Sequence, residues 1–103
     1  MANNAQLAQA ASTVLVTTGD IQAKYQPVRI VFAIGGSQSG LFRTANPQEA
    51  FEKATEALKM AAAQLGGHAV VHCAFGYHPY ANSGCGGGLN FVVHGYGTVV
   101  TLV

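Results

Sequence analysis

Apolar and polar positions alternate along four segments of this chain, as they do in β-strands that lie in a sheet. Residues 12–18 (STVLVTT) and 28–34 (VRIVFAI) are rich in β-branched side chains and predict two strands in the first third. Residues 68–78 and 89–103 predict two more near the C-terminus. In the second segment both faces are apolar except for Arg29, which indicates a strand covered on both sides.

The period changes to that of a helix between the second and third predicted strands. Asn46 is placed as the N-cap, with Pro47 at the first helical position and Glu49 three residues after the cap. Gly66 and Gly67 mark the end of the helix. One apolar stripe steps by three and four residues along it: Phe51, Ala54, Leu58, Ala61 and Leu65. This pattern predicts an amphipathic helix lying on a sheet.

The four strands and one helix predict a single α+β domain over residues 1–103, in the order ββαββ, with one helix packed on an antiparallel-rich sheet. Residues 1–11 are expected to be a frayed or short helical lead, and GGSQSGLFRTA a loop before the helix. We expect the odd-numbered residues of the third and fourth strands to share the core face. His68, His72 and His94 then lie on the opposite face.

The few charged residues of the chain are unevenly distributed. Only 9% of the residues are charged and 50% are hydrophobic, against a typical charged fraction of about 25%. Five of the nine charged residues fall between Glu49 and Lys59. A small domain has too much surface for so few charges, so we expect much of the remaining surface to contact another copy of the chain in a homo-oligomer.

Charge and hydropathy also exclude several classes of partner. The formal net charge of +1 and the lack of Lys and Arg clusters argue against binding to nucleic acid or anionic lipid. The sequence has neither a signal-peptide pattern nor eighteen consecutive apolar residues, which predicts a soluble cytoplasmic protein with no membrane contact. Two cysteines in a chain of this size are expected to be free thiols.

Candidate chemistry gathers in one region, because all four histidines and both cysteines lie between His68 and His94. Imidazole and thiolate are ligands of transition metals such as Zn, Ni or Cu. If His72 and His94 are directly opposite, their Cβ atoms are about 5 Å apart, whereas a one-residue slip would place Cys73 beside His94. His78 or Cys85, or a neighbouring subunit, could complete a metal site. The alternative is that these histidines are polar residues on a solvent or intersubunit face.

Other kinds of site have weaker support in the sequence. The GCGGG run at residues 84–88 lacks the following helix of a phosphate-binding loop, and GGSQSG with Arg43 is a candidate anion site or an ordinary loop. Cys85 with His78 is the one nucleophile pairing available, and a glycine-rich loop would not hold it in place. No catalytic constellation emerges, so we do not expect an enzyme.

Aromatic residues around the hairpin could hold a planar ligand or lie in a subunit interface: Phe75, Tyr77, Tyr80, Phe91 and Tyr96.

Several short runs occur in an order that resembles the YbjQ-like family of small bacterial proteins, often described as heavy-metal-binding. These runs are LVTTGDI, GGSQSG, AAAQLGGHAVV, FGY and HGYGTVV, and the resemblance spans residues 14–100. It implies a βαββ-type subunit that assembles into a pentameric ring. The sequence departs from the family pattern in having His72, Cys73, His78 and Cys85, and in a shorter stretch before GGSQSG. A metal function here would therefore depend on local residues.

Overall fold

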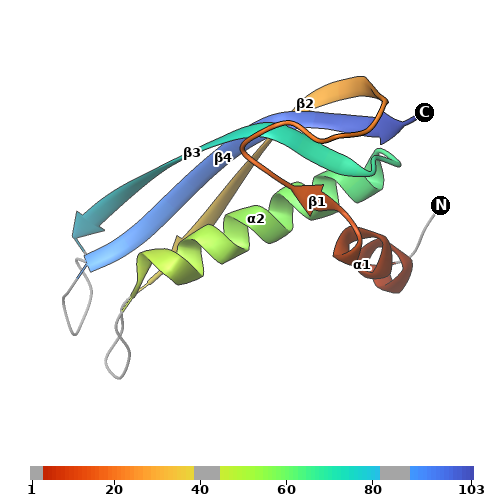
Figure 1. Cartoon of the computed structure of the whole chain (residues 1–103). Helices are drawn as coiled ribbons and strands as arrows, with labels where there is room; N and C mark the ends of the chain where they lie inside the picture. Colours follow the sequence, from red (N-terminus) through yellow and green to blue (C-terminus); the bar gives the residue numbers. More distant parts are fainter. Residues whose placement is uncertain (1–3, 39–44, 82–88) are drawn as a thin grey trace.

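The computed structural model describes residues 4–38, 45–81 and 89–103 (Figure 1). Two helices and four strands follow one another along the chain. They are α1 (Asn4–Ser12), β1 (Leu15–Val16), β2 (Tyr25–Ser37), α2 (Pro47–Gln64), β3 (Ala69–Ala81) and β4 (Leu89–Leu102). The predicted α+β class and the predicted order of its strands and main helix are confirmed. The N-terminal lead is an additional helix, and the first strand is shorter than expected.

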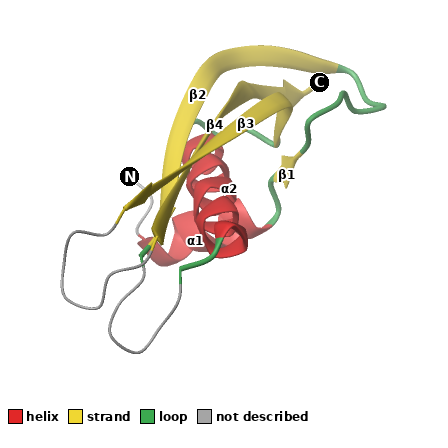
Figure 2. Cartoon of the chain, turned by 90° about the vertical axis from the view of Figure 1, so that its left-hand side faces the viewer, coloured by secondary structure: helices red, strands yellow, loops and turns green. Residues whose placement is uncertain are grey.

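The four strands form one mixed sheet in the order β1-β3-β4-β2. β4 lies between β3 and β2 and is antiparallel to both. β1 is parallel to β3 and contributes two register pairs, Leu15 with Ala69 and Val16 with Val70. Figure 2 shows both helices on the same side of this sheet. One face of the sheet is therefore covered by helix, and the other, which we call the outer face, is not.

The main helix begins and ends at the residues that the sequence predicts. Asn46 has extended backbone angles, and its side-chain oxygen accepts a hydrogen bond of 2.7 Å from the amide of Glu49. Pro47 follows as the first helical residue, where it loses no hydrogen bond. At the other end Gly66 has a φ of 72°, and the amide of Gly67 donates to the carbonyl of Ala62 at 2.8 Å. Gly66 thus stops the helix in the left-handed conformation that glycine adopts without strain.

α2 buries a stripe that is narrower and more alanine-rich than predicted. Its fully buried residues are Ala50, Ala54, Leu58 and Ala62. Ala54 and Leu58 belong to the predicted stripe, whereas Phe51 is 41% exposed. Small side chains at these positions let α2 approach the backbone of β2 closely. Leu58 is the large member of the stripe, and it lies in a core with Val31, Val70 and Val99.

A β-bulge interrupts β3 and changes which residues face the helix. Val71 pairs with Thr98 and Ala74 with Tyr96, so His72 and Cys73 together lie opposite Gly97. His72 has a φ of 53°, a conformation rare for residues other than glycine. Because the bulge adds one residue, the alternation of faces shifts as the strand passes through it.

This shift corrects the predicted faces of the third strand. From the second residue of the bulge onward the prediction holds, and Cys73 and Phe75 face α2. Before it, Val70 faces α2, while Ala69 and Val71 pack on the other side of the sheet. There they are covered by Val100 and by side chains of the segment between β1 and β2, namely Ile21 and Tyr25.

The prediction that the second strand is covered on both faces is wrong for the isolated subunit. Val31 and Ala33 point toward α2 and are buried. Ile30, Phe32 and Ile34 alternate with them on the outer face and are all exposed. The sequence pattern correctly indicates that both faces are apolar, but within one chain only the helix side is covered. Neither described helix is long and apolar enough to cross a membrane.

Candidate functional site

The structure separates the two histidines that were expected to be cross-strand neighbours. His94 pairs with Gly76 in β3 and with Ile34 in β2. His72 lies in the bulge opposite Gly97, further along the sheet. Neither the predicted register nor its one-residue slip occurs, because the residue of β3 opposite His94 is Gly76, four residues beyond His72. The proposed pairing of His72 with His94 is therefore incorrect.

The bulge register instead brings His78 beside His94. Their ring centroids are 5.4 Å apart and the ring planes differ by 22°. Gly76 makes this possible, since a Cβ atom on Gly76 would lie 2.7 Å from Nε2 of His94. The imidazole of His94 thus lies over the bare backbone of β3 and reaches toward His78, two residues along. On its other side it stacks on Phe32, with centroids 6.4 Å apart.

Two imidazoles supply half of a transition-metal site. Zn²⁺ is bound by nitrogen at about 2.0–2.1 Å, usually with four ligands. The two stacked rings would have to turn so that one nitrogen of each points at a common ion. Within residues 4–38, 45–81 and 89–103, no three His, Cys, Asp or Glu side chains come close enough together to hold a metal. Cys85, the predicted thiolate ligand, lies outside the described residues.

His72 has a different environment, which sequence patterns did not indicate. Its Nε2 atom lies 4.0 Å from Oδ1 of Asp20, and both side chains are more than half exposed. The same carboxylate oxygen accepts hydrogen bonds from the hydroxyl of Tyr25 at 2.7 Å and from the amide of Ile21 at 2.8 Å. The Tyr25 bond, then the Ile21 bond, lowers the pKa of Asp20, and the bond to Asp20 raises the pKa of Tyr25. These contacts, together with the hydrogen bond of 2.9 Å from the amide of His72 to the carbonyl of Gly19, hold the segment between β1 and β2 against the bulge.

His68 has a structural role. Its Nδ1 atom accepts a hydrogen bond of 3.0 Å from the amide of Leu102, near the end of β4. A nitrogen that accepts a hydrogen bond carries no proton, so this contact requires the neutral ring with its proton on Nε2. His68 therefore fastens the end of β4 to the start of β3 and is not available as a ligand through Nδ1.

Cys73 is a buried core thiol, as the sequence suggests. Burial raises the pKa of this thiol, which keeps it protonated and weakly nucleophilic. Its sulfur donates to the carbonyl of Val70 at 3.6 Å. Cys85, which was considered as a nucleophile beside His78, and the GCGGG loop lie outside the described residues.

The GGSQSG segment begins inside a strand, contrary to the loop that was predicted. Gly35, Gly36 and Ser37 are the last residues of β2. The Ser37 hydroxyl is buried and accepts a hydrogen bond of 3.1 Å from the amide of Asn46. Ser37 therefore links the end of β2 to the N-cap of α2. Arg43, the basic residue of the candidate anion site, lies outside the described residues.

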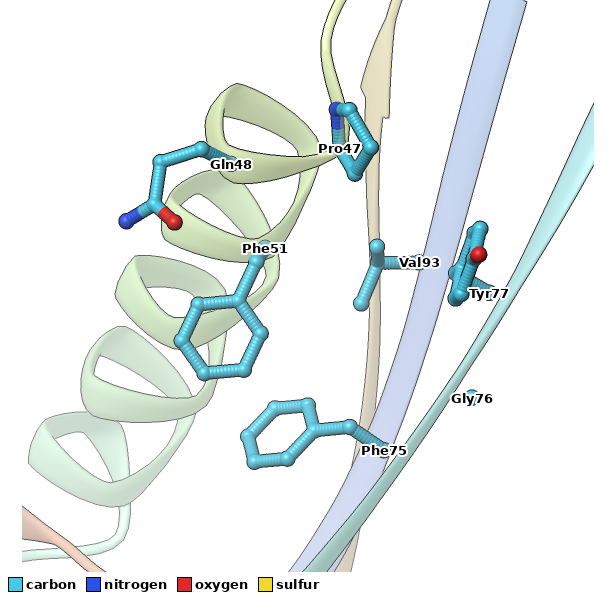
Figure 3. Close-up of a pocket in the computed structure, with 7 residues that line it drawn as sticks. All are labelled: Pro47, Gln48, Phe51, Phe75, Gly76, Tyr77 and Val93. Atoms are coloured by element: carbon cyan, nitrogen blue, oxygen red, sulfur yellow. The ribbon is translucent and has the colours of Figure 1, made fainter.

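A small apolar pocket opens between the first turns of α2 and the middle of β3 (Figure 3). Its volume is ≈ 260 Å³, and it is lined by Pro47, Gln48, Phe51, Phe75, Gly76, Tyr77 and Val93. The rings of Phe51 and Phe75 meet with centroids 4.8 Å apart at an angle of 53°. Drug-sized ligands occupy about 300–1,000 Å³, so this open pocket suits a few side chains better than a cofactor. Of the predicted aromatic group, Phe75 and Tyr77 line this pocket, whereas Tyr96 lies on the outer face of the sheet.

Comparison with known proteins shows the fold and leaves the activity open. No protein-family model matches the chain, and no curated protein is similar to it. A crystal structure of a protein of unknown function from Pediococcus pentosaceus ATCC 25745, of the DUF74 family, is similar over 87% of this chain and 98% of that one. The TM-score is 0.61 and the sequence identity 24%. The chain thus shares the fold of a small protein of unknown function, and its resemblance to YbjQ-like proteins stays a prediction.

Proposed function

We propose that this protein works as a subunit of a homo-oligomer and that assembly covers the outer face of its sheet. One observation carries this proposal. Ile30, Phe32, Ile34 and Tyr96 are 74%, 60%, 59% and 49% exposed, and they adjoin one another on β2 and β4. We call them the outer patch. Together they expose on the order of 500 Å² of side chain, near the top of the range for the largest apolar patch on a monomer.

A second copy of the chain suits this patch better than a charged partner. Glu49, Lys53, Glu56 and Lys59 pair with one another along α2, on the opposite side of the sheet. The patch itself consists of aliphatic and aromatic side chains, which favour contact with another apolar surface. Five subunits are proposed on the resemblance to YbjQ-like proteins. A cytoplasmic location is proposed as well.

Native mass spectrometry of untagged protein tests the assembly and reports bound mass in the same measurement. We expect a discrete oligomer at micromolar concentration and a shift toward monomer for Phe32→Asp. Val103→Asp is the matched control, because Val103 is 76% exposed but lies beyond the end of β4. Circular dichroism checks that both variants are folded. A monomeric wild-type protein at that concentration would contradict the proposal.

Binding of a soft transition metal is a second candidate function, and the contact between His78 and His94 favours it. Both imidazoles lie on the outer face, so an assembled neighbour or the segment containing Cys85 could add the missing ligands. Zn²⁺, Ni²⁺ and Cu²⁺ would be preferred over Mg²⁺ and Ca²⁺, which bind oxygen. Without a metal, the protein would be a structural or small-ligand-holding ring.

Calorimetric titration of metal-free protein with Zn²⁺, Ni²⁺ and Cu²⁺ tests this second function. We expect binding to wild-type protein and to His72→Ala, and at least tenfold weaker binding to the double variant His78→Ala/His94→Ala. Affinity should fall as the pH drops, because a protonated imidazole cannot ligate. Equal affinity in all three proteins, or none in any, would end the metal proposal without affecting the assembly.

A further inference from the structure

Among the described residues, the whole of one edge of the sheet and part of the other have no partner strand. β2 is thirteen residues long and pairs with β4 on one side only. On the opposite edge, β1 and the residues just after it bond to β3 as far as Cys73. From Ala74 to Tyr80, the backbone of β3 bonds only to β4 within the described part of the chain. Long free edges with apolar side chains favour pairing with a further strand.

The side chains along these two edges are complementary in size. On the outer face, β2 presents a row of large apolar residues, Ile30, Phe32 and Ile34. On the same face, the free part of β3 presents two small residues, Ala74 and Gly76, and the ring of His94 lies over Gly76. A large row beside a small row lets side chains interdigitate without voids.

The strand directions are also compatible with a repeating arrangement. β2 and β3 are both antiparallel to β4, so they run parallel to each other. A second copy placed beside the first, with its helices on the same side of the sheet, would therefore offer its β2 in parallel to the free edge of β3. In that position its Ile30 and Phe32 lie next to the small residues of the first copy. Closure of such contacts into a ring with the helices on the outside would turn the outer faces toward the centre of the ring, where they are covered.

The helix layer leaves room for such a neighbour. α2 packs mainly on β2 and β4 and much less on β3. The gap over β3 is the apolar pocket between Phe51, Phe75 and Tyr77 (Figure 3). A neighbouring β2 carries its own α2 on the same side of the sheet, because α2 covers β2 within each chain. The second copy would thus bring a helix toward this pocket while its strand extends the sheet.

We propose that the free edge of β2 in one copy pairs in parallel with residues 74–80 of β3 in the next copy, joining the subunits head to tail. This rests on the proposed homo-oligomer and names its contact. Each subunit uses one edge of each kind, so the chain of contacts can close into a ring of any subunit number. Two-fold pairing of β2 with β2 would leave the β3 edge and its pocket uncovered in every copy.

Thiol cross-linking distinguishes these arrangements in a background without native thiols, Cys73→Ala/Cys85→Ser. The double variant Ile30→Cys/Ala74→Cys is treated with a short bifunctional maleimide and separated under denaturing conditions. We expect a covalent ladder that reaches the full subunit number, and no cross-links from either single cysteine variant. The control pair is Ile30→Cys/Glu56→Cys, since Glu56 lies on the solvent side of α2, and it should give no ladder.

Two results would overturn the proposed contact. Dimers formed by the single variant Ile30→Cys would show two-fold pairing of β2 edges. An assembled double variant that gives no ladder would show that the subunits meet elsewhere, with the homo-oligomer still standing. A double variant that is monomeric in native mass spectrometry, like wild-type protein, would instead refute the assembly itself.

Discussion

Gly35 in β2 lies with its backbone directly against that of Ala54 in α2. A Cβ atom on Gly35 would overlap the backbone nitrogen of Ala54 and the carbonyl oxygen of Ala50. The obstructing atoms are backbone atoms, which cannot turn away as a flexible side chain can. The separation between helix and sheet at this point is therefore set by the absence of a side chain on Gly35.

Substitution of Gly35 by alanine should push α2 away from β2. We expect Gly35→Ala to lower the free energy of unfolding by about 3 kcal/mol, the upper part of the usual range for overpacking. Gly36→Ala is the matched control, because its added Cβ would lie 3.7 Å from the carbonyl oxygen of Phe91, an ordinary contact. Urea denaturation of both variants measures the difference. Equal stability of the two would show that helix and sheet are not held at this distance.

Truncation of Leu58 should leave a cavity in the centre of the core. Leu58 is fully buried and is the largest side chain of the buried stripe of α2. We expect Leu58→Ala to lower the free energy of unfolding by about 2–5 kcal/mol. Gln64→Ala, at the exposed end of the same helix, should change it by less than about 0.5 kcal/mol. A loss below that value for Leu58→Ala would show that the core does not depend on this residue.

The left-handed backbone of His72 gives an unusual order of substitutions. A left-handed residue other than glycine costs about 1–2 kcal/mol, so His72→Gly should be at least as stable as wild type. His72→Val should be less stable by about 1 kcal/mol or more, because a β-branched residue tolerates positive φ poorly. At His78, which lies in the regular part of β3, valine should instead be more stable than glycine. If the glycine and valine variants had the same order of stability at both positions, His72 would not be strained by its positive φ.

The hydrogen bond between Tyr25 and Asp20 should make stability depend on pH at two ends of the scale. The pKa of Asp20 is lowered, so its contribution is present above the unfolded value near 3.8 and is lost as the pH falls through the folded value. The pKa of Tyr25 is raised, so its contribution is present below 10.0 and is lost as the pH rises through the folded value. Denaturation midpoints of Tyr25→Phe should thus fall below those of wild type most clearly between about pH 5 and 9. A difference independent of pH would exclude this bond as its cause.

The helix was predictable because its signals are local. Asn46, Pro47 and Gly66 act on neighbouring backbone groups, so a sequence pattern contains the whole interaction. The exposed position of Phe51 was not predictable in the same way. It depends on which side of α2 meets the sheet, and the backbone that lies against Gly35 of β2 is that of Ala50 and Ala54.

The bulge limited what could be predicted about the histidines. A simple alternation through His68, His72 and His94 places all three on one face, and nothing in the composition of β3 identifies the extra residue. Gly97, opposite the bulge, gives a partial signal, because a Cβ there would lie 2.6 Å from the sulfur of Cys73. The predicted pair also assumed a register four residues away from the observed one, because His94 lies opposite Gly76 and not opposite His72, and this error hid the contact between His78 and His94.

The apolar character of both faces of β2 was visible in the sequence, but the exposure of one of these faces within the subunit was not. Alternation indicates that Ile30 and Phe32 belong to an apolar surface, and it cannot tell a helix of the same chain from a neighbouring molecule. The low charge content supports the proposed homo-oligomer, which stays a prediction.

The extra residue at His72 and Cys73 also determines how this chain tolerates change in length. Deleting His72 alone would leave every other side chain intact and would restore an uninterrupted alternation along β3. With the pairing on both sides kept in place, Val71 would still lie opposite Thr98 and Ala74 opposite Tyr96, and Cys73 alone would lie opposite Gly97. A single missing codon here would therefore remove the bulge without moving any other side chain to the opposite face, whereas a residue lost from the regular part of β3 would shift the pairing by one residue. This is the point in β3 at which the chain is best able to lose one residue.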